Sequence, residues 1–528
     1  MNRTRVVWVF GLLVALSVGA VAYRAGVRDG SKNPGAPGAA AAVSDALNAE
    51  LERIRTAEKI RDPYERCMAY PNPAEFNWSP AAIETMCRRQ SRRMLGWKEI
   101  EDALNRHHPE IVDQAFESYL SKNYAEPGQH GFLTWTYWWM FQSPSKWTED
   151  TTNHWVESDP NSAYALAARG IHLSQAAYDA RGGKRASETP AANFERMHEL
   201  VERSRRDLER SLELNPRLIA AYHGLLHTSR LVDDPQEAQR RDAWIEQALA
   251  LDPDDQWIYQ DWMDAVDPSW GGSVAEMESV ADQAARRADT NPALPLLKAS
   301  ALCAQADEYR CESCSKDGRK SLDLYRKAAA FGPAGCFLEG AGAAAVLAQD
   351  PQTAVRYYSQ AYRFLGGDEW LAYRAQNLRS IGRGDWALQN LNDALARNPG
   401  NTTLLYALAL AYVDAGRYGD AEKTYRDMLK LEPGNQTAAL ELARLYLSAL
   451  NAPDKARPLI DGVLERDPTL ASAWFLQATL YEAIDNQPGY RDAAAKFLRY
   501  ANRTDPWQAT NISIVEAKLR QIAPAAQN

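Results

Sequence analysis

Small and apolar residues recur every three or four positions through the last third of the chain, and a proline ends each round of the pattern. Pro399, Pro433 and Pro468 are 34 and 35 residues apart, and Pro506 follows 38 residues later. A period near 34 residues is typical of helical hairpins that stack side by side, each covering the apolar face of its neighbour. The pattern therefore predicts an all-α solenoid in this part of the chain.

One round of the pattern shows what each kind of residue does. Alanine is expected where the two helices of a hairpin approach most closely, because a larger side chain would force them apart. Gly416 is expected to end the first helix with a positive φ, and Pro433 to end the second. The expected contact positions are Leu405, Leu408, Ala409 and Tyr412 on the first helix and Ala421, Tyr425 and Met428 on the second.

This pattern resembles the tetratricopeptide repeat, and the resemblance extends from about Gly335 to Pro506. We therefore assign tetratricopeptide repeats to residues 335–510 and a C-terminal capping helix to residues 511–528. The resemblance implies a groove, lined by the first helix of each hairpin, that binds a protein or peptide.

The residues that this resemblance places in the groove are mainly apolar and include arginine. Such a stripe suits an amphipathic or extended peptide that carries an acidic group. The alternative is that these side chains are buried by helix packing, which is favourable in itself. The groove positions are Tyr406, Leu410, Leu440, Arg444, Phe475, Thr479 and Arg379.

Residues between 100 and 292 resemble a second family, the bacterial envelope and secreted proteins catalogued as domain of unknown function 4034. The stretches that carry the resemblance are "LAARG" (Leu166–Gly170), "RSRRDLERSLELNP" and "DPSWGGSVAEM" (Asp267–Met277). No activity is attached to that family, so the resemblance implies none. In the last stretch, Ser273 and Glu276 predict a capping box, and Trp270 is expected to fill the helix junction.

The upstream repeats are less regular than those near the C-terminus. Asn215-Pro216, Asp252-Pro253 and Asn291-Pro292 continue a similar spacing, with insertions. We therefore expect degenerate helical repeats over residues 159–334, after an N-terminal helical domain over residues 46–158.

The N-terminus carries an uncharged apolar run, residues 6–23, after a basic start. This run is just long enough to span a bilayer, although Ala20-Val21-Ala22 also resembles a signal cleavage site. We favour an uncleaved anchor, because residues 24–45 have the composition of a flexible linker. The prediction is a single-pass protein of the bacterial inner membrane, with residues 1–5 in the cytoplasm and the bulk in the periplasm; the alternative is a secreted or periplasmic protein after cleavage.

Composition argues against nucleic acid as a partner. The chain has 60 basic and 69 acidic residues, a formal net charge of −9. A phosphate-binding protein needs Lys and Arg gathered on one face. The densest basic run, "CRRQSRRM" from Cys87 to Met94, is interpreted as a solvated helix face.

Six cysteines, an even number, fit an oxidising compartment. Cys67 and Cys87 are close in sequence, and a cluster follows downstream. We expect structural disulfides in both groups, while a zinc site or a redox "CESC" pair remains open for the cluster. The cluster consists of Cys303, Cys311, Cys314 and Cys336.

Two further stretches are candidates for chemistry. In "HGLLH", His223 and His227 lie one helical turn apart and are able to share a metal. Gly224 stands where metalloproteases have glutamate, and no third ligand is evident, so we expect a surface or groove pair and no metal. The aromatic run "FLTWTYWWMF", Phe132 to Phe141, is expected to be domain core, with a membrane-interface belt as the alternative.

Together these observations predict a membrane-tethered scaffold on the exported side that binds a protein or peptide and needs no cofactor, in envelope or secretion assembly. Two alternatives remain open. One is an envelope hydrolase with a site among the histidines and carboxylates of residues 100–230, and the other is a structural spacer in a larger complex.

Overall fold

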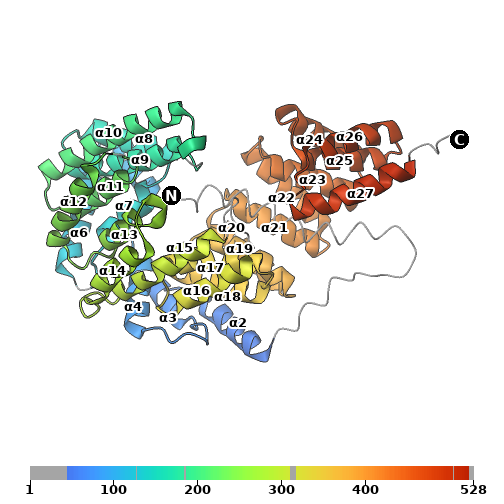
Figure 1. Ribbon diagram of the computed structural model, residues 1–528. Coiled ribbons are helices and arrows are strands. Elements are labelled where there is room, and N and C mark those ends of the chain that lie inside the picture. The colour runs from blue at the N-terminus through green and yellow to red at the C-terminus, as the bar shows by residue number, and fades with distance from the viewer. Residues whose placement is uncertain are drawn as a thin grey trace. The chain divides into compact units, whose positions relative to one another are not determined.

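The computed structural model describes residues 44–126, 128–183, 186–232, 234–309, 317–503 and 505–522. Every regular element in these ranges is helical (Figure 1), which confirms the expected all-α class. The chain divides into two compact units. The first takes in Ala49–Asp350 and Arg363–Gly366, and the second Pro351–Tyr362 and Gly367–Asn528.

The first unit is built from helices of 7 to 24 residues that pack against their neighbours in the chain. Helices α2 (Asp45–Ala57) and α18 (Pro351–Leu365) contribute residues to both units. The others are α3 (Pro63–Ala69), α4 (Pro80–Gln90), α5 (Trp97–Asn105), α6 (Pro109–Ala125), α7 (Phe132–Phe141), α8 (Lys146–Ser158), α9 (Ala163–Arg181), α10 (Ala191–Leu214), α11 (Ile219–Ser229), α12 (Glu237–Leu251), α13 (Gln256–Ala265), α14 (Val274–Ala285), α15 (Ser300–Glu308), α16 (Gly318–Ala329) and α17 (Gly335–Leu347), with 3-10 turns at Ala186–Glu188, Pro268–Trp270 and Leu294–Ala299.

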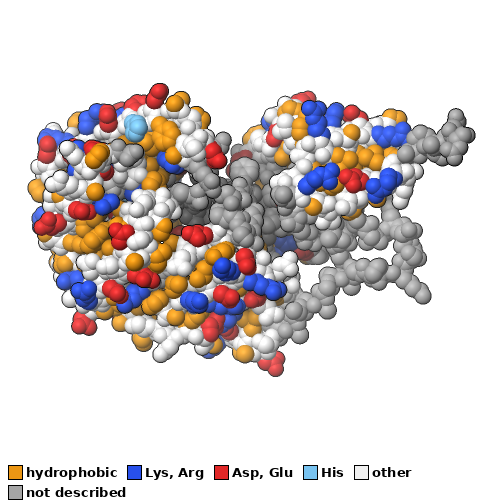
Figure 2. Space-filling view, viewed as in Figure 1, with side chains coloured by type: hydrophobic (Ala, Val, Ile, Leu, Met, Phe, Trp, Pro, Cys, Tyr) orange, Lys and Arg blue, Asp and Glu red, His pale blue; other side chains and the backbone are white. Residues whose placement is uncertain are grey.

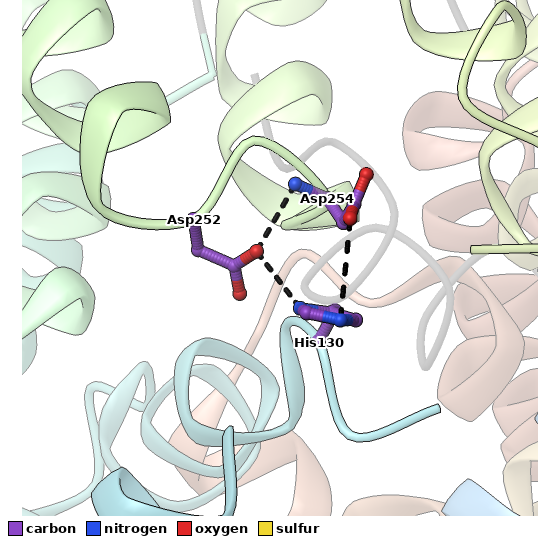
Figure 3. A group of neighbouring side chains, drawn as sticks. All are labelled: His130, Asp252 and Asp254. Atoms are coloured by element: carbon purple, nitrogen blue, oxygen red, sulfur yellow. Dashed lines mark hydrogen bonds and ion pairs between the residues drawn. The ribbon is translucent and has the colours of Figure 1, made fainter. Parts of the chain in front are cut away.

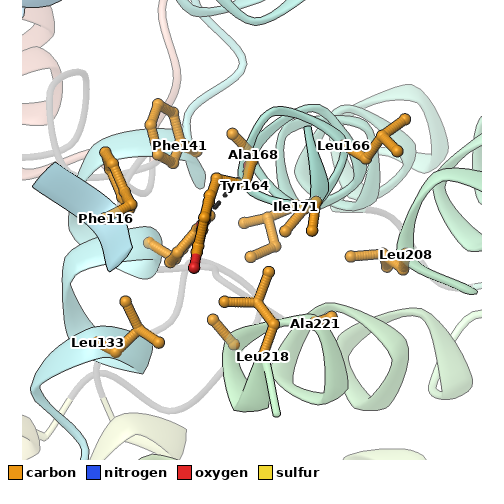
Figure 4. Packing of buried hydrophobic residues seen from close by; sticks show 14 of the residues in the cluster. Phe116, Leu133, Phe141, Tyr164, Leu166, Ala168, Ile171, Leu208, Leu218 and Ala221 are labelled. Atoms are coloured by element: carbon orange, nitrogen blue, oxygen red, sulfur yellow. Dashed lines mark hydrogen bonds between the residues drawn. The ribbon is translucent and has the colours of Figure 1, made fainter. Parts of the chain in front are cut away.

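One apolar core runs from α5 to α13. Figure 4 shows the part of it that α6, α7, α9, α10 and α11 contribute. It crosses the domain boundary expected near residue 158, because Trp155 and Ser162, on either side of that boundary, both donate hydrogen bonds to Asp113. The aromatic helix α7 belongs to this core: seven of its ten residues are buried, while Trp139 is exposed. This confirms the interpretation of the aromatic run as core.

Helices α9, α10 and α11 meet closely around Leu208. A Cβ added at Gly170 would lie 2.6 Å from Leu208, and one added at Gly224 would lie 2.8 Å from it. Both positions therefore require glycine for the helices to approach this closely. The stretch "LAARG", which ends at Gly170, has a packing explanation.

Apart from its segments of α2 and α18, the second unit consists of four helical hairpins and a closing helix. Each hairpin contacts the next along the chain. The hairpins are α19 (Asp368–Ser380) with α20 (Gly384–Arg397), α21 (Thr402–Asp414) with α22 (Tyr418–Leu431), α23 (Gln436–Ser448) with α24 (Pro453–Arg466) and α25 (Ala471–Ala483) with α26 (Gln487–Tyr500), and α27 (Pro506–Ile522) follows. The closing helix thus begins five residues before the expected position.

Local signals lie at the ends of α21 and α22, and Gly416 and Pro433 act as predicted. Asn401 caps α21 by accepting a hydrogen bond from the amide of Leu404 at 3.1 Å. Gly416, with φ of 72°, follows the end of that helix, and Pro433 stands two residues after the end of α22. All residues from Leu404 to Ala411 are buried, so α21 is covered on every side.

Four of the six cysteines lie in the described residues and form disulfides. Cys67–Cys87 joins α3 to α4, and Cys303–Cys336 joins α15 to α17. Cys311 and Cys314 lie outside the described residues, as do residues 6–23 and most of the linker.

The "DPSWGGSVAEM" stretch forms the junction between α13 and α14. Ser273 accepts a hydrogen bond from the amide of Glu276, although its hydroxyl, and not its amide, pairs with the Glu276 carboxylate. Trp270 packs edge-on against Tyr178 of α9, with ring centroids 6.0 Å apart, and belongs to the apolar cluster of α9 and α10.

Candidate partner-binding and histidine sites

The structure buries three of the apolar residues that the sequence places in a partner groove. Tyr406, Leu410 and Leu440 are 6%, 7% and 9% exposed and belong to the core of the second unit. This is the placement that the packing alternative expects for these three. Their groove role stays a prediction.

The other groove positions are more accessible. Phe475 is partly buried between Phe497 and Trp507, at 5.4 Å from each ring centroid. Thr479 is also partly buried and donates to the carbonyl of Phe475 at 3.0 Å.

Two arginines from different hairpins influence the same tyrosine. Burial raises the pKa of Tyr406, and the positive charges of Arg444 and Arg379 oppose that rise. Arg379 on α19 donates to Asp414 at 2.6 Å, and Arg444 on α23 pairs with Glu441. Both guanidinium groups are partly accessible, and each is held by an acidic side chain.

The histidine pair on α11 is buried, and the sequence-based expectation of a surface or groove position is wrong for it. His223 and His227 are 3% and 4% exposed. The Nδ1 of His223 lies 2.6 Å from Asp261, and His227 contacts Gln142 and Ser174. Burial holds the pKa of His227 well below its ordinary value, so this ring is neutral near pH 7.

A second histidine cluster joins the loop before α7 to the turn between α12 and α13 (Figure 3). The Nδ1 of His130 lies 2.9 Å from Asp252, and its Nε2 lies 4.0 Å from Asp254. Asn123 donates to Asp252, while Arg287 and Thr290 donate to Asp254. Because protein groups already pair with both carboxylates, we interpret the cluster as a structural clamp.

Asp255 caps α13 at the same turn. Its carboxylate accepts hydrogen bonds from Thr134 at 2.6 Å and from the amide of Trp257 at 2.8 Å. Burial, and next the charge of Asp252, raise its pKa to about 7. The hydrogen bond to Asp252 raises the pKa of His130 against the effect of burial.

The arginine run after Cys87 is only partly solvated, which corrects the sequence interpretation. Arg89 is buried and donates to Gln256 at 3.0 Å, and burial lowers its pKa to about 10. Arg92 lies over the ring of Phe132 at 4.5 Å. Arg88 and Arg93 remain exposed. On the visible face of the molecule, charges of both signs are interspersed (Figure 2).

Comparisons with known proteins bear on the second unit. Residues 380–427 and 412–480 match the Tetratricopeptide repeat family. No curated protein matches the chain. No helix in the described residues is long and apolar enough to cross a membrane.

Solved structures with a similar arrangement include yeast Tom70, with a TM-score of 0.34 and 13% identity over 80% of this chain and 96% of that chain. A second is the APC/C hetero-tetramer Cut9-Hcn1, with a TM-score of 0.32 and 12% identity over 79% and 95%. At these TM-scores the likeness carries no argument about function. The family match and the hairpins of α19 to α26 agree: residues 380–480 of this chain are tetratricopeptide repeats.

Proposed function

We propose that this protein is a membrane-tethered scaffold on the exported side that binds a partner protein or peptide through its tetratricopeptide repeats. The repeats themselves make the chain a scaffold suited to protein–protein interaction. The partly accessible ion pairs of Arg379 with Asp414 and of Arg444 with Glu441 carry the finer proposal of an acidic partner group. A partner carboxylate would replace Asp414 or Glu441 on these guanidinium groups.

Replacing Arg379 and Arg444 together with glutamine is expected to reduce partner recovery at least tenfold without lowering the melting temperature of the second unit. The ion pairs lost are partly solvated and contribute about 0–1 kcal/mol each. The partner is first isolated with the full chain by affinity capture and identified by mass spectrometry. Recovery is then compared between variants.

Arg417→Gln is the matched control, because Arg417 is exposed and pairs with Asp420 beyond the end of α21. Equal recovery with the double variant and with this control would contradict the arginine site. Tyr406 and Leu410 are poor test positions, because their burial makes a loss of stability the first consequence of replacing them.

Support for the tether comes from the uncharged run over residues 6–23. Deleting residues 1–32 is expected to release a folded protein from membranes, since no described helix could hold it there. Fractionation with carbonate washing measures this. A truncated chain that sediments with membranes as the full chain does would refute the anchor, and a mature N-terminus at Tyr23 would establish signal cleavage instead.

The resemblance of residues 100–292 to the family of unknown function stays a prediction and adds no activity. Assignment to the bacterial periplasm rests on that resemblance and on the apolar run, and it is part of the proposal.

A further inference from the structure

A cavity of about 170 Å³ lies in the first unit, where the ends of three helices meet. Its walls come from the end of α11 and the loop after it, the start of α12, the end of α13 and the 3-10 turn Pro268–Trp270. In another protein, a cavity of about 150 Å³ holds a molecule of benzene. The cavity is therefore large enough for a small organic molecule, and its surface is mainly polar.

Two acidic side chains line the cavity, and arginines that are not part of the lining neutralise both. Glu237 accepts hydrogen bonds from Arg205 at 2.5 Å and from Arg240 at 3.2 Å. Asp234 accepts a hydrogen bond from Arg240 at 3.0 Å. These two carboxylates therefore leave little uncompensated negative charge beside the cavity.

Arg230, at the end of α11, brings a guanidinium group to the lining. Its side chain is 8% exposed. Of its guanidinium nitrogens, only Nη1 donates a hydrogen bond to a described residue, Asp264 at 3.1 Å. Its Nε is buried and has no hydrogen-bond partner in the described part of the chain. The donors of this buried cation are thus only partly used.

Arg241, on α12, is the cation of the lining with the weakest partner. Among the described residues, its side chain pairs with Asp242, the next residue in the chain. The Nε and Nη2 of Arg241 both lie 3.4 Å from one Asp242 oxygen, which is beyond the usual range of about 2.7–3.2 Å for an N–H···O bond. Asp242 is 67% exposed, so water competes for its carboxylate. One edge of the Arg241 guanidinium group is therefore available to a better acceptor.

The balance of charges around the cavity suits a ligand with one negative charge. Glu237 and Asp234 have their own arginines, and Arg230 has Asp264, so the charge of Arg241 is the one that is weakly compensated. A phosphate group carries about −1.5 to −2 charges at pH 7 and would leave negative charge uncompensated in a partly buried place.

We propose that this cavity binds a small polar monocarboxylate, whose carboxylate takes the Nε–Nη2 edge of Arg241 in place of Asp242. A carboxylate on a guanidinium edge forms two parallel hydrogen bonds of about 2.7–2.9 Å. Ser229 also lines the cavity, and its hydroxyl donates to the carbonyl of Leu226 at 2.8 Å, so its oxygen can accept from a hydroxyl group of the ligand. The site goes beyond the proposed scaffold function and depends neither on the tether nor on the repeats of the second unit.

The test is binding of lactate, which carries one carboxylate and one hydroxyl group, to the purified full chain in detergent. Saturation-transfer NMR at pH 8 is expected to show saturable binding. Lactamide, which has a similar shape and no charge, is expected to bind at least tenfold more weakly. Inorganic phosphate at the same concentration is expected not to displace lactate.

Four variants locate the binding. Arg241→Gln is expected to lower the affinity for lactate at least tenfold, and Arg241→Lys, which keeps the charge without the planar edge, is expected to lower it less. Ala238→Leu fills part of the cavity without changing its charge and is also expected to abolish binding. Arg210→Gln is the matched control, because Arg210 is exposed and pairs with Glu213 on α10. Hydrogen exchange of amides in α11 and α12 checks that each variant is folded.

The proposal is overturned if lactate shows no saturable binding, or if Arg241→Gln binds it as tightly as Arg210→Gln does. Equal binding of lactamide and lactate, or displacement by phosphate, would show that a single negative charge is not what the site recognises. Unchanged binding in a folded Ala238→Leu variant would place the lactate on the open surface and not in the cavity.

Discussion

Trp155→Ala is expected to lower the free energy of unfolding of the first unit by about 3–5 kcal/mol. Trp155 is fully buried and packs against Phe116 and Phe141, with ring centroids 5.3 and 6.1 Å away. Alanine leaves a large cavity there, and it also removes the indole N–H that donates to Asp113 at 2.9 Å. Burial already raises the pKa of Asp113, so losing a donor adds to the cost.

The matched control is Trp139→Ala, at an exposed position of α7 in the same unit. Its expected cost is about 0.5 kcal/mol or less. Because the chain has two units, unfolding is followed by hydrogen exchange of amides in α6 to α8, and not by a single melting temperature. Similar losses for the two tryptophans would show that the core around Trp155 is not packed as described.

Asp255→Asn is expected to stabilise the first unit at pH 8 by on the order of 4 kcal/mol and to leave it nearly unchanged at pH 4. The pKa of Asp255 is about 7 in the folded protein, above its ordinary value of 3.8. Because the pKa of Asp255 is higher in the folded than in the unfolded protein, its contribution to the stability of the first unit is complete below about pH 4. That contribution is lost as the pH rises through 7. Asparagine mimics the neutral acid and still accepts the amide hydrogen bond of the helix cap.

The measurement is the denaturant midpoint of the first unit as a function of pH in the parent and the variant. In Asp255→Asn, the stability of the first unit is still expected to decline somewhat above pH 6.5. The reason is that His130 also has a raised pKa, so its contribution to stability is likewise lost as the pH rises. Adding His130→Gln removes that decline. Parallel pH profiles for the parent and for Asp255→Asn would contradict the burial of a titrating acid at this turn.

The repeat architecture was predictable because its signals are local. Pro399, Pro433, Pro468 and Gly416 all lie just beyond a helix end, and each acts on the helix next to it. Helix ends can be identified from such residues without knowing which helices pack together in the fold.

The candidate sites depend on pairings between distant parts of the chain. His227 meets Gln142 across 85 residues, and His223 meets Asp261 across 38. No period in the sequence connects these positions, so the buried partners of the histidine pair were missed. The burial of Arg89 was missed for the same reason, since its partner Gln256 is 167 residues away.

The burial of Tyr406 and Leu410 shows a different limit. Periodicity identifies the apolar positions of α21 but does not distinguish a side chain that faces a groove from one that a neighbouring hairpin covers. Only the packing of α21 among its neighbours decides between the two, and here it places both side chains in the core.

The contacts between neighbouring hairpins make the second unit a modular array. Neighbouring hairpins are in contact along the chain, and two of them carry a tyrosine at the same position of the first helix, Tyr412 and Tyr446. A duplication or loss of one whole hairpin would therefore recreate a joint of the same kind, whereas an insertion of a few residues within a helix would shift every contact after it. Evolution can change the length of this array in steps of one hairpin without redesigning a core.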